Sequence, residues 1–386
     1  MADIRMGVII NGATGRMGTT QHMANLLAIA REGGLKLKNG DRLVPELTLV
    51  GRDAGRLKAL AAAHGNPRWT TRLEEALAGS DKIFMDCSAT GDRPRRVKQA
   101  IAAGKHIFIE KPTAPTVDEA MELARLADKA GLKHGVIQDK LFLPGFATMM
   151  SLRNAGFFGR ILSVKIDAGS WIFDGTEGGT GRACQRPSWN YRKADGGGLA
   201  LDMMAHWRYM IDRLAEPVTG VCALMSTAMP ERVDEQGKRY KVDVEDTNFA
   251  LVRLQNGAVG VIMNSWATRP RRDDTMVVQI DGTDGSAVAG RFRCYTQSAA
   301  DTPEAFIKAA VPGGVDLMAD WKEVPPTPAH GPFRQCWENF LRHVGGEGPY
   351  LPTLVEGAKA VQLADLAYRS VAERRWIDVP ELKLAN

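Results

Sequence analysis

Residues 6–18 read MGVIINGATGRMG. The stretch opens on a continuous apolar run, Met6–Ile10, which is typical of a parallel strand buried on both faces. Three glycines spaced three residues apart follow, and a helix is predicted from about Met17 to Ala30. Because a strand that turns through glycines into a helix begins a βαβ unit, this stretch predicts an α/β fold.

The rest of the first part of the chain keeps this alternation. Strands are predicted at Met6–Ile10, Leu47–Val50, Lys82–Asp86, His106–Ile109 and Gly135–Gln138, and helices at Met17–Ala30, Arg56–His64, Arg93–Ala103 and Val117–Ala130. Repeated βα units imply a doubly wound parallel sheet of the Rossmann type. The long connection 31–46 is predicted to be an inserted loop with a small hairpin.

The glycine turn carries the first chemical prediction. Glycines at a strand-to-helix turn let backbone amides approach a pyrophosphate, which then lies at the positive end of the helix. An ordinary tight turn is the alternative interpretation, but the position after the first strand favours a dinucleotide site. The residues of this turn predicted to bind the cofactor are Gly12, Thr14, Gly15, Arg16 and Met17.

The end of the second strand bears on which nicotinamide cofactor is bound. A carboxylate at that point usually binds the ribose of NAD. Here Gly51 occupies it and Arg52 follows, and a guanidinium suits the 2′-phosphate of NADP. Arg16 is a second candidate cation. The missing acid and the two cations favour NADP. NAD stays open, because Asp53 could bind the ribose instead and Arg52 could be only a surface residue.

Size and composition narrow the class of protein. A chain of 386 residues fits two domains, predicted as 1–145 and 146–386, with the C-terminal helix expected to pack back on the first. The net charge of +5 comes from basic residues in ones and twos, which favours neither nucleic acid nor membrane partners. An odd number of scattered cysteines and no signal peptide predict a cytoplasmic protein without a metal site.

The second half has a different pattern. Longer strands are predicted within 160–173, 220–229, 247–268 and 274–290, and helices at 199–214, 333–344 and 354–373. Asn-Gly at 256–257 is a hairpin signal. Strands grouped in this way predict an α+β domain with an open, mainly antiparallel sheet.

Two further motifs lie in a fixed order. In AAGKHIFIEKPTAP (102–115), Glu110 and Lys111 end a buried strand and Pro112 follows; in ADGGGLALDMMAHWRYMID (194–212), a glycine triplet precedes Asp202 and His206. With the glycine turn, they make the chain resemble the Gfo/Idh/MocA oxidoreductases over nearly its whole length. The turn alone also resembles dihydrodipicolinate reductase, but the His-His motif of that family is missing here.

The resemblance implies the roles of the site residues. Lys111 would stabilise the developing alkoxide of a sugar and His206 would take its proton, while Asp202, one helical turn away, would orient the imidazole or bind a neighbouring hydroxyl. Ser88, Glu110 and Lys111 are predicted to contact the cofactor, and Glu110 would either hold the lysine or contact the nicotinamide ribose. The remaining predicted substrate contacts are Lys140, Trp189, Tyr191 and Arg192. For His22, one turn into the first helix, we expect a surface position, and the alternative is that it faces the cofactor cleft.

These motifs predict an NAD(P)-dependent oxidoreductase that transfers a hydride between nicotinamide and a hydroxyl-bearing carbon, and the resemblance implies that this carbon belongs to a sugar or cyclitol. The resemblance further implies a homodimer or homotetramer formed through the C-terminal sheet. Two alternatives remain open. One is a non-catalytic sugar or nucleotide sensor, and the other is an NAD-requiring glycoside hydrolase on the same fold.

Overall fold

The computed structural model describes residues 2–171, 186–303, 314–328 and 330–384. The chain divides into two compact units. Unit 1 comprises Met1–Asp139, His330–Gln362 and Leu382–Asn386, and unit 2 comprises Lys140–Ala329 and Leu363–Glu381. Residues 330–362, which the sequence analysis assigned to the second domain, thus belong to unit 1.

An aromatic cluster explains the membership of residues 330–362 in unit 1. Phe108, in a central strand of that unit, stacks on Phe340 with ring centroids 4.2 Å apart and meets the edge of Trp337 at 4.8 Å. Tyr350 contacts both Phe108 and Phe340. Burying these large rings together favours the return of the chain to its first sheet.

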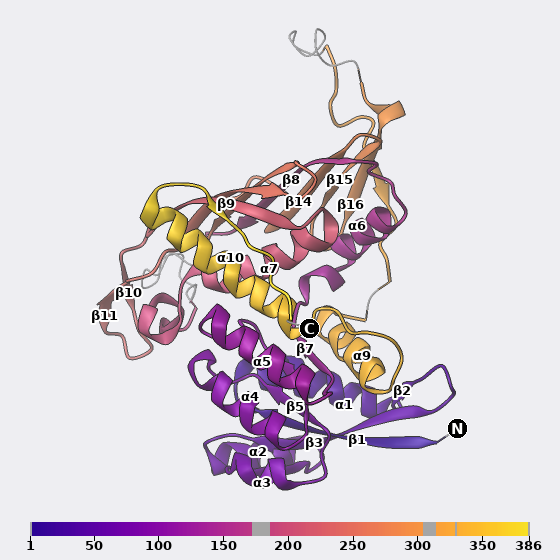
Figure 1. The fold of residues 1–386 in the computed structure, drawn as a ribbon, viewed down its shortest axis with the longest axis vertical. Coiled ribbons are helices and arrows are strands. Elements are labelled where there is room, and N and C mark those ends of the chain that lie inside the picture. The colour runs from indigo at the N-terminus through magenta and orange to yellow at the C-terminus, as the bar shows by residue number, and fades with distance from the viewer. Residues whose placement is uncertain (1, 172–185, 304–313, 329, 385–386) are drawn as a thin grey trace. The chain divides into compact units, whose positions relative to one another are not determined.

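Unit 1 is built on a seven-stranded sheet (Figure 1). Its strands are β1 (Asp3–Asn11), β2 (Leu35–Lys36), β3 (Arg42–Val50), β4 (Arg68–Thr70), β5 (Ile83–Asp86), β6 (His106–Ile109) and β7 (His134–Val136). The order is β2-β3-β1-β5-β6-β7, and β4 also pairs with β3. All pairs are parallel except β2 with β3. The chain leaves β1 toward β3 on one side and returns to β5 on the other, so the carboxyl ends of β1 and β5 form the switch point where such sheets bind ligands.

Helices connect these strands largely as the sequence predicted, but α3 (Leu73–Ala78) was not predicted and the first helix differs at its start. They are the π-helical segment η1 (Gly18–Met23), α1 (Ala24–Arg31), α2 (Ala54–Ala63), α3 (Leu73–Ala78), the short η2 (Thr90–Asp92), α4 (Arg93–Ala102), α5 (Val117–Lys129), α9 (Pro332–Val344) and the first part of α10 (Leu354–Glu373). The predicted first helix begins with a π-helical turn rather than a regular α-helical one, and such turns are frequent at functional sites. Helices α4 and α5 lie side by side (Figure 1), while α1 packs against β3 and α9.

Unit 2 contains an open nine-stranded sheet and a small hairpin. Its strands are β8 (Ile161–Gly169), β9 (Val218–Ser226), β10 (Glu231–Val233), β11 (Arg239–Lys241), β12 (Thr247–Leu254), β13 (Val259–Ser265), β14 (Met276–Gly282), β15 (Gly285–Ala289), β16 (Cys294–Ser298), β17 (Lys322–Val324) and β18 (Ile377–Asp378). The order in the sheet is β17-β16-β15-β14-β8-β13-β12-β9-β18, and β10 pairs with β11. Only β8 and β13 are parallel neighbours, so the prediction of a mainly antiparallel sheet is confirmed.

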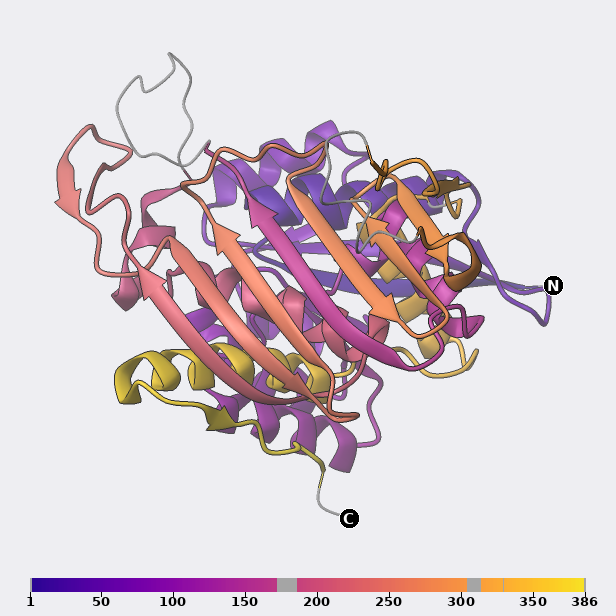
Figure 2. The same cartoon turned by 90° about the horizontal axis from the view of Figure 1, so that it is seen from above.

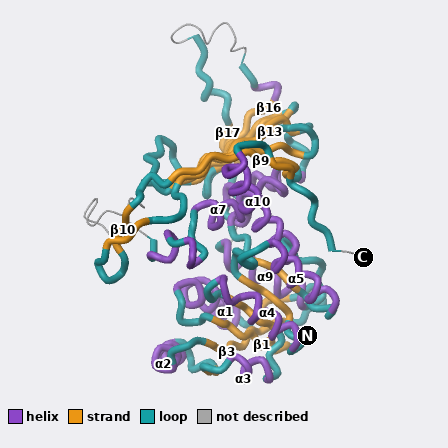
Figure 3. The backbone as a smooth tube through the Cα atoms, turned by 60° about the vertical axis from the view of Figure 1, so that its left-hand side comes forward, coloured by secondary structure: helices purple, strands orange, loops and turns teal. Residues whose placement is uncertain are grey.

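The long helices of unit 2 lie on one face of this sheet, as Figure 3 shows for α7 and α10. They are α6 (Pro144–Asn154), α7 (Leu199–Leu214) and the later part of α10, and the short helical turns of the unit are η3 (Lys140–Phe142), η4 (Ser188–Tyr191), η5 (Lys193–Asp195) and η6 (Ala299–Asp301). In β12 the side chains alternate between buried and exposed along the strand. Figure 2 looks onto the other face, where none of these long helices covers the strands.

Candidate active site

The glycine turn of unit 1 has a geometry that only glycine permits. Gly12 has a φ of +86°, and a Cβ built there would lie 2.9 Å from the backbone nitrogen of Ser88. A Cβ on Gly18 would lie 2.5 Å from the carbonyl oxygen of Gly12. The turn therefore presents backbone without Cβ atoms at the switch point of the sheet, and Gly15 is exposed there. This is the cradle that a pyrophosphate requires, so these residues fit a dinucleotide.

The end of β3 presents cations rather than a free carboxylate. Asp53 is the N-cap of α2, where its Oδ1 accepts the backbone N–H of Arg56 at 2.9 Å. Arg56 in turn donates from Nη2 to the carbonyl oxygen of Thr14 at 2.9 Å, a contact with the glycine turn that the sequence analysis missed. Arg16 and Arg52 are both exposed. The alternative ribose ligand, Asp53, is thus engaged in capping.

A buried ion pair, also missed by the sequence analysis, joins the ends of the central strands. Arg93 donates from Nε to Asp86 Oδ2 at 2.8 Å, and both side chains are almost completely buried. The other carboxylate oxygen accepts from Asn11 at 2.6 Å and from Ser88 at 2.7 Å. Arg93 also donates to the carbonyl oxygens of Ser88 and Pro112. One guanidinium therefore ties together the carboxyl ends of β5 and β6, where the predicted cofactor residue Ser88 lies.

Removing this cation should destabilise unit 1 strongly. In an Arg93→Met variant, the Asp86 carboxylate stays buried without its charge partner, and we expect the free energy of unfolding to fall by about 3–5 kcal/mol. Urea-induced unfolding measures the change. Arg95→Met, on the exposed side of the same helix, is the matched control and should change stability by less than about 0.5 kcal/mol. Equal stability of the two variants would show that the ion pair contributes nothing.

The Glu-Lys-Pro segment follows β6. Glu110 is buried; its Oε1 lies 2.9 Å from Nε2 of His22, and its Oε2 accepts the backbone N–H of Lys111 at 3.2 Å. Lys111 itself is half-buried, and its bond to Pro112 is cis. The expectation that His22 lies at the surface is wrong, because this side chain is fully buried. Its spacing from the buried Leu26 and Ile29 was the available signal, since i, i+4 and i+7 share one helix face.

In unit 2, the start of α7 is fixed by an acidic side chain from a distant segment. Glu245 accepts the backbone N–H of Ala200 at 2.7 Å and the hydroxyl of Tyr368 at 2.9 Å. A Cβ on Gly198, whose φ is +116°, would lie 2.7 Å from that hydroxyl. The last glycine of the triplet is therefore needed for this close approach. Burial raises the pKa of Glu245 above its ordinary value, against the hydrogen bonds that lower it.

Asp202 and His206 lie one turn apart near the start of α7, as the sequence predicted. Asp202 forms an ion pair with Arg186, a residue that the sequence analysis did not select. The guanidinium of Arg186 also lies 5.1 Å from the ring centroid of Trp266. Asp202 is therefore held as part of a charged cluster, and His206 is buried beside it on the same helix.

The other predicted substrate residues have different environments. Tyr191 is fully buried, with Arg232 over its ring at 3.8 Å and its hydroxyl accepting the backbone N–H of Arg186 at 3.1 Å. This placement leaves no surface of Tyr191 for a sugar and gives it a supporting role instead. Trp189 is half exposed. Arg192 lies over Tyr240 at 4.5 Å.

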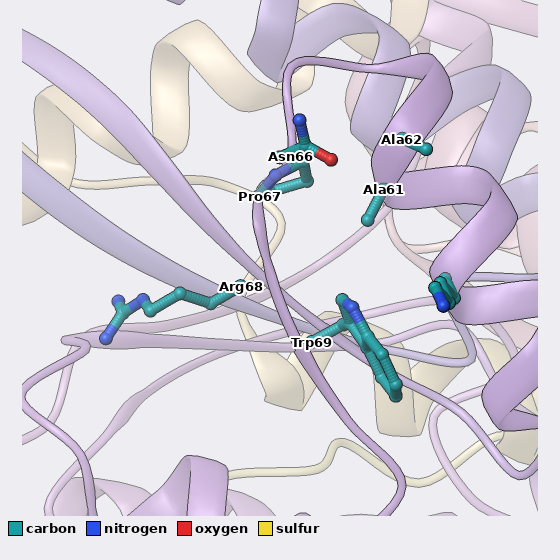
Figure 4. A pocket seen from close by; sticks show the side chains of 7 residues that line it. Ala61, Ala62, Asn66, Pro67, Arg68 and Trp69 are labelled. Carbon is teal, nitrogen blue, oxygen red and sulfur yellow. The ribbon is translucent and has the colours of Figure 1, made fainter.

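Lys140, the remaining predicted contact, begins unit 2 in the short η3 and is partly buried. A surface hollow of about 560 Å³ lies elsewhere in unit 1 (Figure 4). Its lining consists of Lys58, Ala61, Ala62, Asn66, Pro67, Arg68 and Trp69. Because it offers no carboxylate, imidazole or thiol, it does not provide the acid–base chemistry of a dehydrogenase.

Two absences concern the described residues only. Among them, no group of three or more histidine, cysteine, aspartate or glutamate side chains is arranged to hold a metal ion. Within the same ranges, none of the helices combines the length and apolar character needed to span a bilayer.

The fold of unit 1 and its glycine turn define a dinucleotide-binding protein. Residues 6–138 match the model of the oxidoreductase family with an NAD-binding Rossmann fold, and residues 146–288 match that of the GFO/IDH/MocA C-terminal domain. The chain therefore belongs to the Gfo/Idh/MocA family of oxidoreductases. The predicted family, the two-part fold class and the NAD(P)-dependent oxidoreductase activity are confirmed.

Individual proteins of known activity are similar to this chain over most of their length. D-xylose dehydrogenase of Paenarthrobacter nicotinovorans is 41% identical over 384 residues, which cover 98% of each chain. Levoglucosan dehydrogenase of Pseudarthrobacter phenanthrenivorans is 26% identical over 314 residues, covering 73% of this chain and 76% of that protein. A solved levoglucosan dehydrogenase in complex with NADH superimposes with a TM-score of 0.81 at 22% identity, covering 98% of this chain and all of the other.

Proposed function

We propose that this NAD(P)-dependent sugar dehydrogenase oxidises D-xylose or an aldose of similar size. The observation that carries the proposal is the 41% identity to a D-xylose dehydrogenase over 98% of both chains. Levoglucosan dehydrogenase, a second similar protein, is also named for a sugar substrate. A bound nicotinamide would supply the acceptor for the hydride that leaves the CH–OH carbon.

The roles that we assign to the side chains follow from charge and proton balance. Loss of hydride from a carbinol requires that its hydroxyl also lose a proton, and a neutral imidazole at His206 would take it. Lys111 would stabilise the negative charge that develops on the same oxygen. Asp202, whose carboxylate is held by Arg186, would orient the sugar through a second hydroxyl. The proposal requires the side chains of Lys111 and His206 to act on one oxygen.

A substrate screen tests the function. Purified protein is given D-xylose, other aldoses, myo-inositol or levoglucosan with NAD⁺ or NADP⁺, and formation of reduced nicotinamide is followed by absorbance. The highest kcat/KM is expected with D-xylose or a similar aldose. Turnover of a cyclitol alone would overturn the substrate assignment. Sugar binding without reduction would favour the sensor, and release of an aglycone from a glycoside without net reduction would favour the hydrolase.

For the cofactor, we propose that the enzyme prefers NADP to NAD. It is supported by the exposed Arg52 after β3 and by the engagement of Asp53 in capping α2. An Arg52→Ala variant should raise the KM for NADP⁺ about 10-fold, the effect of losing one charge-assisted hydrogen bond, and should leave the KM for NAD⁺ almost unchanged. Lys58→Ala, exposed on α2, is the control. An equal change for both cofactors would contradict a contact with the 2′-phosphate.

The uncovered face of the unit 2 sheet supports a proposed homodimer or homotetramer. Apolar side chains project from neighbouring strands on this face, and Leu224 is 77% exposed. Its companions on β12 and β13 are Phe249, Leu251, Val259 and Met263. A contiguous apolar surface of this kind usually marks an interface, and a second copy of the chain offers a matching one. Sedimentation velocity should show no monomer at micromolar concentration, whereas a stable monomer would exclude this assembly.

A cytoplasmic location is also proposed. Its support is the state of the described cysteines, since Cys87, Cys222, Cys294 and Cys336 all have free thiols. Free thiols are usual in a reducing compartment.

A further inference from the structure

A buried series of hydrogen bonds leads from α9 to the backbone of Lys111, entirely within unit 1. Trp337 Nε1 donates to His22 Nδ1 at 3.2 Å. His22 Nε2 lies 2.9 Å from Glu110 Oε1. The second carboxylate oxygen of Glu110 accepts the backbone N–H of Lys111 at 3.2 Å. Trp337 and His22 are both fully buried, and Glu110 is nearly so, so solvent does not compete for these bonds.

The first bond fixes the protonation of the imidazole. An indole N–H can only donate, so Nδ1 of His22 must offer its lone pair. The single ring proton is therefore on Nε2, where it is donated to Glu110. A second proton on Nδ1 would face the indole N–H directly. His22 is thus held as the neutral Nε2–H tautomer, and its bond to Glu110 joins a neutral donor to a carboxylate.

Glu110 transmits this constraint to the segment that bears Lys111. Both carboxyl oxygens of Glu110 accept an N–H, which fits the ionised form, and the hydrogen bond from His22 acts to lower the pKa of Glu110 against the effect of burial. The resulting carboxylate has one oxygen on His22 and the other on the Lys111 amide. On the far side of Lys111, the carbonyl oxygen of Pro112 is held by Arg93. The backbone at Lys111 is therefore anchored from both directions.

We propose that His22, in the tautomer set by Trp337, is a positioning residue that orients Lys111 by holding the carboxylate of Glu110. This inference rests on the proposed role of Lys111 at the reacting oxygen. It gives a function to a side chain of the first helix and to one of α9, neither of which was a candidate site residue. A misplacement of about 1 Å at a reacting group can cost about 100-fold in rate, so the loss should appear in kcat.

Three variants test the role in catalysis. His22→Ala removes the donor to Glu110, and kcat should fall about 100-fold while the KM for the sugar and the Kd for the cofactor change little. His22→Gln offers an amide N–H to Glu110 and a carbonyl oxygen to Trp337, so it should recover most of the lost kcat. His134→Gln is the matched control in unit 1, because Nδ1 of His134 accepts the backbone N–H of Leu354 instead of an N–H from Trp337. An unchanged kcat in His22→Ala, or a loss that Gln does not recover, would overturn the proposal.

A measurement without turnover separates this inference from the proposed function. In histidine-labelled wild-type protein, long-range ¹H–¹⁵N correlations should show His22 as the Nε2–H tautomer. In Trp337→Phe, Nδ1 loses the indole N–H that it accepts, and the pure Nε2–H pattern of the wild type should be lost. An Nδ1–H or imidazolium signal for His22 in the wild type would refute the tautomer. If wild type instead lacks activity with every sugar, the function fails while this result stands.

Discussion

A Lys111→Met variant is expected to bind the cofactor with unchanged affinity and to lose roughly 1,000-fold in kcat, the loss typical when a group that stabilises a developing oxyanion is removed. Methionine keeps most of the length of the unbranched side chain and removes the ammonium group with its charge and N–H donors. The backbone N–H of Lys111 would still donate to Glu110, so the segment should keep its conformation. Steady-state kinetics measure kcat and KM, and quenching of intrinsic fluorescence measures cofactor binding.

The control for this variant is Lys129→Met, at the exposed end of α5 in the same unit. It removes the same charge far from β6 and should keep wild-type kcat. If Lys111→Met lost less than about 10-fold in kcat, the ammonium would not stabilise the reacting oxygen. A loss confined to cofactor affinity would instead make Lys111 a cofactor ligand only.

A His206→Asn variant should lose about 10²–10⁴-fold in kcat, the usual contribution of a general base. Asparagine keeps a polar group in the same region of α7 but cannot take up a proton at neutral pH. In the wild type, the imidazole must be unprotonated to act as base, so kcat/KM should fall as the pH is lowered. In the His206→Asn variant, kcat/KM should be low and should no longer fall as the pH is lowered.

Two further substitutions on α7, a neighbouring site residue and an exposed control, are compared with His206→Asn. Asp202→Asn keeps the shape of the side chain but removes the charge that pairs with Arg186, and a smaller loss of about 10-fold is expected for an orienting group. Arg213→Ala, exposed near the other end of α7, should leave kcat unchanged. A His206→Asn variant that retained the acidic decline would show that another group is the base.

The main helices and strands were predictable because each is long enough to show the periodic spacing of apolar residues that is typical of its type. Helix α7 has the predicted bounds, 199–214, since its apolar positions repeat with helical spacing over sixteen residues. The hairpin between β12 and β13 was marked by Asn-Gly, and Gly257 has the positive φ that this turn needs. Shorter elements such as β4, β10 and β17, with three residues each, were missed because three residues show no period.

The candidate site was predictable only in part. Motifs identified the glycine turn, Lys111, Asp202 and His206, because each follows a recognisable strand end or helix start. Arg186 and Glu245 were missed, since nothing in their own neighbourhoods indicates the helix that they contact. Tyr191 was selected as a substrate contact because aromatic rings suit sugars. Its complete burial, with contacts to Arg232 and Arg186, is visible only in the folded structure.

The sequence by itself determined the two-part architecture, the dinucleotide turn and the order of the charged motifs, because these depend on local spacing and on glycine at a few positions. Tertiary structure alone decided the partners of the charged groups. His22 meets Glu110 across 88 residues and Trp337 across 315, and Asp86 finds Arg93 in a buried site. The physical reason is that a buried polar group must be satisfied by whichever donor or acceptor the packed core brings to it, and local sequence does not specify which one that is.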